Sequence, residues 1–127
     1  MIKLKSKLKN GFTLIELLVV ISIISILVAV GATSYQRAVK VSRDSKRKTD
    51  LEQIRQALET YRSENGIYPA SVTWESDLLN GYIANIPTDP KDLDYTYTNP
   101  TSTTYELCAS LETIETPTTC NYTVTNP

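Results

Sequence analysis

The sequence predicts an α+β fold in which one long N-terminal α-helix packs against a small antiparallel β-sheet. Residues 12–32 form an apolar run, and residues 33–64 contain no proline or glycine and are rich in good helix formers. From Tyr68 the composition changes to Pro, Thr, Asn, Asp and Tyr, with turn signals between short β-prone segments. One long helix followed by a small sheet accounts for both halves.

The chain divides into four predicted parts. They are a leader at residues 1–11, a membrane-spanning helical half at 12–32, an amphipathic half of the same helix at 33–65, and a head of loops and strands at 66–127.

Charge is distributed unevenly along the 127 residues. Residues 33–62 carry eight basic and four acidic groups, whereas residues 63–127 carry one basic and nine acidic groups. The chain has no histidine, which excludes imidazole catalysis and histidine metal sites, and its two cysteines are too few for a four-thiolate zinc site. No pairing of a nucleophile with a base is visible, so we do not expect an enzyme.

Residues 1–11 contain four lysines and no acidic residue, which is typical of a short cytoplasmic segment that is processed rather than folded. The alternative is a secretory signal peptide cleaved after one of the small-residue pairs, Ala29 and Gly31 or Val30 and Ala32. The apolar run is longer than the roughly 7 to 15 residues of a signal peptide core, so we favour its retention in the mature protein.

The apolar run Phe12–Ala32 is long enough to cross a membrane, since 21 residues of helix span about 30 Å. It contains one carboxylate, Glu16, and the next basic residue is Arg37. An acid inside the bilayer costs about 3 kcal/mol, so we expect Glu16 to have a partner. The alternative is that Glu16 snorkels to the cytoplasmic head groups.

The second half of the helix is predicted to be amphipathic and to end at Asn65 and Gly66, which form a left-handed cap before Pro69. Its apolar face comprises Leu51, Ile54, Leu58 and Tyr61, with Ala57 beside them. Oppositely charged residues four positions apart predict two ion pairs on the helix, Asp44 with Lys48 and Arg55 with Glu59.

Four basic residues interrupt the apolar stripe between Val41 and Asp50: Arg43, Lys46, Arg47 and Lys48. The simplest interpretation is a solvated helix segment. A basic band that contacts phosphates, of lipid head groups or of DNA, is the alternative. We favour the solvated segment because no aromatic side chains alternate with these charges.

In the head, a short helical or looped segment around Trp74 and Leu78 is expected to pack on the long helix. Three strands are predicted, at Tyr95–Thr98, Thr104–Leu111 and Asn121–Thr125. The sheet is expected to place its apolar face on the apolar face of the helix.

Cys108 and Cys120 lie in a tail with few large apolar residues, which favours a disulfide and therefore an oxidising compartment outside the cytoplasm. Two separate buried thiols are the alternative. The disulfide also indicates that the head lies outside the membrane.

The segment Gly11-Phe12-Thr13-Leu14-Ile15-Glu16, followed by an unbroken apolar helix, resembles the class III signal of type IV pilins and type II secretion pseudopilins. Residues 51–69, LEQIRQALETYRSENGIYP, are similar to the end of the long helix and the following turn in these families. The resemblance covers about half of the chain well and implies a lollipop-shaped subunit.

The resemblance implies cleavage by a prepilin peptidase between Gly11 and Phe12, followed by N-methylation of Phe12. It further implies extraction from the cytoplasmic membrane by assembly machinery into an extracellular or periplasmic helical homopolymer, with residues 12–32 as its core. There Glu16 would pair with the amine of Phe12 of its own or a neighbouring copy and set the register of assembly.

The acidic loop Asp89, Asp92 and Asp94 resembles a calcium-binding loop of the major pseudopilin. No defined calcium motif is present, so a solvated acidic turn is favoured and no cofactor is required. The cysteine pair instead resembles the disulfide-bounded region of many type IV pilins. Asn121-Tyr122-Thr123 matches a glycosylation sequon, a pattern too common to support a prediction.

We therefore predict a structural subunit of a type IV pilus-like filament. The first alternative is a pseudopilin of type II secretion or DNA uptake. A DNA-binding minor pilin that uses the four basic residues, and a membrane-anchored binding module that does not polymerise, are further alternatives.

Overall fold

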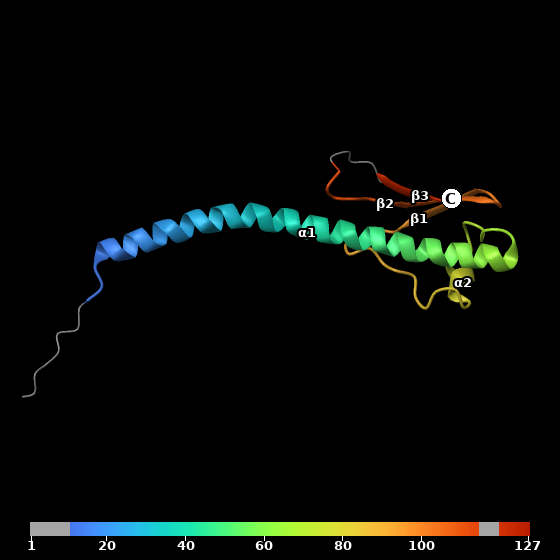
Figure 1. Cartoon of the computed structure of the whole chain (residues 1–127), viewed down its shortest axis with the longest axis horizontal. Coiled ribbons are helices and arrows are strands. Elements are labelled where there is room, and N and C mark those ends of the chain that lie inside the picture. Colours follow the sequence, from blue (N-terminus) through green and yellow to red (C-terminus); the bar gives the residue numbers. More distant parts are fainter. Residues whose placement is uncertain (1–10, 115–119) are drawn as a thin grey trace, which may run out of the picture. The chain divides into compact units, whose positions relative to one another are not determined.

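The computed structural model describes residues 11–114 and 120–127. The predicted leader, apart from Gly11, lies outside the described residues. The chain divides into two units, which end and begin at Arg37 and Ala38. The elements are two helices, α1 (Leu14–Asn65) and α2 (Trp74–Leu79), and three strands, β1 (Thr96–Thr101), β2 (Thr104–Ala109) and β3 (Tyr122–Thr125), as Figure 1 shows. This arrangement confirms the predicted α+β fold.

Helix α1 is continuous over 52 residues and includes Gly31. It begins two residues after the predicted start because Thr13 forms its N-cap rather than its first turn. It ends where Gly66 adopts a left-handed backbone conformation with φ of 79°, and the Gly66 N–H donates to the carbonyl of Arg62 at 2.7 Å. The predicted cap at Asn65 and Gly66 is therefore confirmed.

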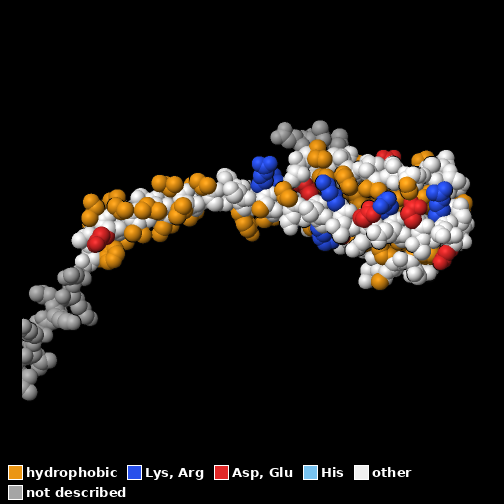
Figure 2. Space-filling model, viewed as in Figure 1, with side chains coloured by type: hydrophobic (Ala, Val, Ile, Leu, Met, Phe, Trp, Pro, Cys, Tyr) orange, Lys and Arg blue, Asp and Glu red, His pale blue; other side chains and the backbone are white. Residues whose placement is uncertain are grey.

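In the first unit the apolar side chains of α1 are exposed to the surroundings along the whole segment. Figure 2 shows hydrophobic side chains covering the visible face of this part of the helix, whereas charged side chains gather on the second unit. Within the described residues, α1 is the one helix that is long and apolar enough to cross a membrane by length and composition.

The second unit is built around the C-terminal half of α1. The strands form an antiparallel sheet in the order β1-β2-β3, and in Figure 1 the sheet and α2 lie on different sides of α1. The buried core takes residues from both helices and from the sheet, namely Leu51, Ile54, Ala57, Leu58, Tyr68, Trp74, Leu78, Tyr97, Tyr105, Leu107 and Ala109. The predicted contact between the helix face and the sheet is confirmed, with Tyr61 half-buried at its margin.

The starts of β1 and β3 lie one residue after the predicted ones, and the ends of β1 and β2 differ by two or three residues for identifiable reasons. β1 extends past Pro100 to Thr101, because β1 is an edge strand whose register shifts between Thr98 and Thr101, and a proline that lacks an N–H is tolerated there. β2 ends at Ala109 rather than Leu111, because Leu111 pairs with the side chain of Asn121 instead of a backbone strand.

Candidate functional site

The start of α1 forms a reciprocal capping box between Thr13 and Glu16. The Thr13 N–H and the Thr13 hydroxyl both donate to Oε2 of Glu16, at 2.8 and 2.7 Å, and the Glu16 N–H faces Oγ1 of Thr13 at 3.3 Å. The Thr-x-x-Glu spacing supplies this motif, which satisfies donors that a helix start otherwise leaves unpaired. Glu16 therefore has a local partner within its own chain. Thr13 was not among the predicted site residues, although the Thr-x-x-Glu spacing that forms the capping box was visible in the sequence.

The side chains around Glu16 form an open apolar surface. Phe12 is 79% exposed, and a shallow groove of about 350 Å³ is lined by Phe12, Ile15, Glu16, Val19 and Val20. Such a surface is stable only in contact with lipid or with other apolar side chains. Phe12 is joined to Gly11 in this chain, so the amine predicted to pair with Glu16 exists only after cleavage.

Gly11 is exposed, and a Cβ placed on it would meet nothing within 4 Å. Local packing therefore does not require a glycine at this position.

A second polar site lies in the head, where the guanidinium of Arg47 is fully buried among three carboxylates. Its Nε and Nη2 donate to the two oxygens of Asp89, and Nη1 donates to Asp44 at 2.8 Å and to Glu112 at 3.0 Å. Burying a charge is costly unless it is paired and hydrogen-bonded, and here four donor contacts meet this requirement.

Glu112 connects this guanidinium to two further cations. Arg43 binds it through two parallel hydrogen bonds of 2.7 and 2.6 Å, and the Nζ of Lys91 lies 3.0 Å from its Oε2. We call these six residues the head charge network; it consists of Arg43, Asp44, Arg47, Asp89, Lys91 and Glu112. Its three cations balance its three carboxylates.

The head charge network shifts the pKa values of its members. Hydrogen bonds from Arg43 hold the pKa of Glu112 far below its usual value. Burial opposes ionisation of Asp44, but hydrogen bonds from Glu112 and Thr113 outweigh it and lower the pKa of Asp44. Burial likewise opposes ionisation of Asp89, and hydrogen bonds from Arg47 and the Lys91 N–H lower the pKa of Asp89. All three carboxylates are therefore charged at neutral pH.

The four basic residues predicted as a solvated or phosphate-binding band are engaged within the chain instead. Arg43 and Arg47 belong to the head charge network, and Lys46 pairs with Asp50 at 2.6 Å. Lys48 lies over the ring of Tyr122, with Nζ at 5.3 Å from the ring centre. The prediction of a solvated segment is wrong for Asp44, Arg47 and Asp50. These three residues are buried, because loops distant in sequence cover this part of the helix.

Asp89, the first carboxylate of the loop compared with a calcium site, accepts hydrogen bonds from within the chain. Oδ1 of Asp89 accepts from Arg47 and from the N–H of Lys91 at 2.7 Å, and Oδ2 accepts from Arg47 Nε. Asp92 and Asp94 are exposed. In residues 11–114 and 120–127, no group of three acidic, histidine or cysteine side chains is arranged to hold a metal ion. The donor set therefore does not fit a calcium ion.

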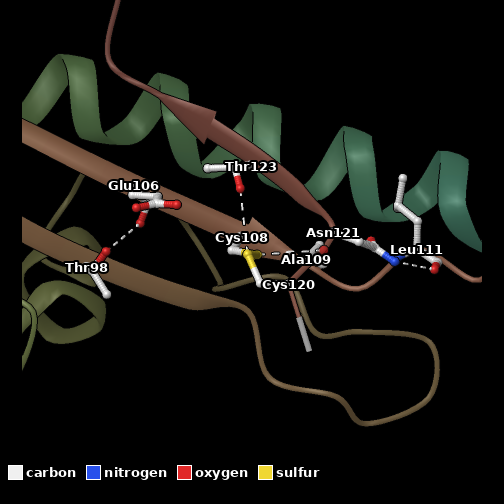
Figure 3. Close-up of a disulfide and its surroundings, with 8 residues drawn as sticks. All are labelled: Thr98, Glu106, Cys108, Ala109, Leu111, Cys120, Asn121 and Thr123. Carbon is white, nitrogen blue, oxygen red and sulfur yellow. Dashed lines mark hydrogen bonds between the residues drawn. A yellow bond between two sulfur atoms is a disulfide. The ribbon is translucent and has the colours of Figure 1, made fainter. Parts of the chain in front are cut away.

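Cys108 and Cys120 form the predicted disulfide, with their Cα atoms 5.7 Å apart (Figure 3). Beside it, the side-chain amide of Asn121 pairs with Leu111 in the manner of a strand residue, with Oδ1 accepting at 2.6 Å and Nδ2 donating at 2.9 Å. Asn121 is the acceptor residue of the glycosylation sequon.

Two family models match adjoining parts of the sequence. Residues 6–32 match the prokaryotic N-terminal methylation motif, and residues 35–113 match type II secretion system protein G.

Known relatives fall into two groups. The type II secretion system core protein G of Vibrio cholerae is 28% identical over 109 residues, which cover 76% of this chain and 75% of that protein. The corresponding protein of Escherichia coli K12 is 28% identical over 106 residues, 72% and 73% of the two chains. The type IV major fimbrial protein FimA of Dichelobacter nodosus is 43% identical over 53 residues, 42% of this chain and 34% of FimA. No solved structure matches the chain.

The predicted relationship to type IV pilins and type II secretion pseudopilins is confirmed by these matches, and the families concerned are structural rather than enzymatic. The match to protein G spans more than half of the sequence. This chain belongs to the type II secretion system protein G family.

Proposed function

We propose that this chain is a structural subunit of a pilus-like filament, anchored in the membrane before assembly and polymerised through residues 12–32. The observation that carries the proposal is the uninterrupted exposed apolar surface of α1 from Leu14 to Val30, in which Glu16 is the only charged residue. A bilayer covers such a surface before assembly, and the same surface of other copies replaces lipid afterwards.

The chain would be inserted once through the cytoplasmic membrane, with the head outside. A prepilin peptidase would cut between Gly11 and Phe12 and methylate the new amine of Phe12, and inner-membrane machinery would then extract the subunit. The match of residues 6–32 to the N-terminal methylation motif, which includes Gly11 and Phe12, supports this route.

Glu16 would change partner during assembly. In this structure the N–H and hydroxyl of Thr13 donate to its carboxylate. In the filament the charged amine of Phe12 would be a stronger partner, because it adds an attraction between opposite charges that the neutral Thr13 hydroxyl does not supply. The carboxylate would thereby favour one register between neighbouring copies.

Two kinds of filament are candidates. The match of residues 35–113 to protein G covers much of α1 and the head as far as Thr113, and it favours a secretion pseudopilus. The 43% identity to FimA is confined to a short region, and the Cys108–Cys120 disulfide resembles that of pilins; both favour a surface pilus. We do not propose DNA as a partner, because Arg43 and Arg47 belong to the head charge network, Lys46 pairs with Asp50 and Lys48 lies over the ring of Tyr122.

The first experiment is intact-mass and N-terminal analysis of the protein from membranes that contain the peptidase. We expect a chain that begins at methylated Phe12. An intact Met1 would support a plain membrane anchor instead, and an N-terminus near Ala32 or Thr33 would support a secreted soluble domain.

The second experiment compares Glu16→Ala with a matched control, Ser25→Ala, in the same apolar helix. The Ser25 hydroxyl donates to the carbonyl of Ile21 in its own helix at 2.7 Å. We expect Glu16→Ala to abolish or disorder filaments and Ser25→Ala to leave them intact.

Deleting the gene then separates the two filament types, since loss of surface filaments indicates a pilus and loss of protein export indicates a pseudopilus.

A further inference from the structure

The buried guanidinium of Arg47 connects three parts of the head that are far apart in sequence. Asp44 lies three residues earlier on α1, Asp89 lies in the loop between α2 and β1, and Glu112 follows β2. Without a central cation, these three carboxylates would repel one another at short range. One positive side chain therefore determines where both loops sit against the helix.

The guanidinium of Arg47 is hydrogen-bonded to carboxylate oxygens that a calcium ion would need as ligands. Calcium requires six to eight oxygen ligands, most of them from carboxylates and carbonyls. Both oxygens of Asp89 already accept hydrogen bonds from Arg47, and Oδ1 also accepts the Lys91 N–H. Asp92 and Asp94 remain; they line a cavity together with Asp89, but in the described part of the chain no three such side chains are arranged to hold a metal ion.

Charge balance leads to the same conclusion. Arg43, Arg47 and Lys91 neutralise Asp44, Asp89 and Glu112, so Asp89 carries no uncompensated charge with which to attract a divalent ion. No buried side-chain nitrogen or oxygen in the described residues lacks a hydrogen-bond partner, so the network leaves no ligand atom waiting for a metal.

We propose that Arg47 is an internal substitute for a divalent cation: its guanidinium orders the loop at Asp89 and the turn at Glu112, so that the head folds and keeps its stability without calcium. This role goes beyond the filament function and holds for a pilus or a pseudopilus subunit alike.

The first test uses the purified full-length protein in detergent micelles. Thermal unfolding of the head is followed by near-ultraviolet circular dichroism in excess calcium chloride and in excess chelator. We expect midpoints that agree within about 2 °C, because a ligand that does not bind the native state cannot stabilise it. A midpoint that rises with calcium concentration would overturn the proposal.

Terbium provides a second, direct readout of calcium-like binding. Trp74 lines the same cavity as Asp92 and Asp94, so a lanthanide ion bound there would lie near an excited indole and become luminescent. We expect no saturable luminescence that calcium can displace. Saturable, calcium-displaced luminescence would show a metal site in the loop and contradict the proposal.

Variants then test the guanidinium itself. Arg47→Met keeps the buried stem and removes the charge, and we expect its unfolding midpoint to fall by more than about 10 °C. Arg47→Lys keeps a positive charge but lacks the planar guanidinium with its several donors, and we expect it to recover part of the lost unfolding midpoint. The control is Lys40→Met, an exposed lysine on the same helix, for which we expect a change below about 2 °C.

An Arg47→Met protein as stable as the control would contradict the proposal. If Arg47→Met does not fold at all, the calcium and terbium measurements on the unsubstituted protein still decide whether the head depends on a metal.

Discussion

Asp44 binds Thr113 twice across 69 residues of sequence: its Oδ2 accepts the Thr113 N–H at 2.9 Å and the Thr113 hydroxyl at 2.7 Å. The other oxygen, Oδ1, accepts the N–H of Glu112 at 2.8 Å and the Arg47 guanidinium at 2.8 Å. One carboxylate on α1 thus holds the turn that leads from β2 toward the disulfide loop. The turn is fixed to the helix by polar contacts rather than by apolar packing.

Replacing Asp44 by Asn should destabilise the head by about 3 kcal/mol, because it removes one partner of a buried ion pair and leaves Arg47 with less compensation. Denaturant unfolding of the full-length protein in detergent measures this loss. The control is Asp77→Asn, since Asp77 also accepts a threonine hydroxyl, at 2.7 Å from Thr73, but on an exposed surface. Equal effects of the two substitutions would argue against a buried network.

The head should lose stability in acid. Asp44, Asp89 and Glu112 have folded-state pKa values below those of the unfolded chain. Their contribution is therefore complete above the unfolded carboxyl range near pH 4 and declines as the pH falls through the lower folded values. Unfolding midpoints between neutral pH and strong acid test this, and an unchanged midpoint below about pH 4 would contradict it.

The head should lose stability in strong alkali as well. Burial raises the pKa of Tyr97 to about 12, and its hydroxyl donates to the carbonyl of Pro69 at 2.8 Å. The folded state thus favours the neutral phenol; this contribution is present below the unfolded pKa of about 10 and is lost as the pH rises through the folded value. Burial also raises the pKa values of Tyr95 and Tyr105. An ultraviolet titration should therefore show several late phenols, with one fewer in Tyr97→Phe. A late phase of unchanged amplitude in that variant would contradict the assignment to Tyr97.

Removing the disulfide by the double substitution Cys108→Ser and Cys120→Ser should cost about 3 kcal/mol, the chain-entropy value for a loop of this size. The pair is 12 residues apart in sequence. Urea unfolding measures the difference. A reducing agent should reproduce the loss in the unsubstituted protein and have no further effect on the double variant; a reductant effect on the variant would point to another cause.

The local features of this chain were predictable from sequence. The helix, its cap at Gly66, and the apolar face at Leu51 and Leu58 each follow from spacing within a few residues. The predicted alternation of β2 holds at Tyr105, Glu106 and Leu107 but fails at Cys108, which is buried like its neighbours. The disulfide was predictable because the chain has two cysteines and a tail that needs stabilisation.

The head charge network was not predictable, because its members lie up to 69 residues apart. Helical spacing suggested Asp44 with Lys48 and Arg55 with Glu59, whereas Asp44 pairs with Arg47 and Arg55 pairs with Glu52. On an isolated helix such pairs differ by only a few tenths of a kcal/mol, so distant loops decide among them.

Thr13 provides a test of how Glu16 is held before assembly. Thr13→Val keeps the shape of the side chain and removes the hydroxyl that contacts Glu16 at 2.7 Å. An N-cap contributes about 1 kcal/mol, so amide hydrogen exchange over residues 14–18 should become about fivefold faster in detergent micelles, with the head unaffected. Thr33→Val is the matched control, because Thr33 only bonds its own helix through the carbonyl of Val30. If exchange near Glu16 responds equally to both substitutions, the capping box does not hold the carboxylate, and Glu16 must depend on the membrane or on another copy from the start.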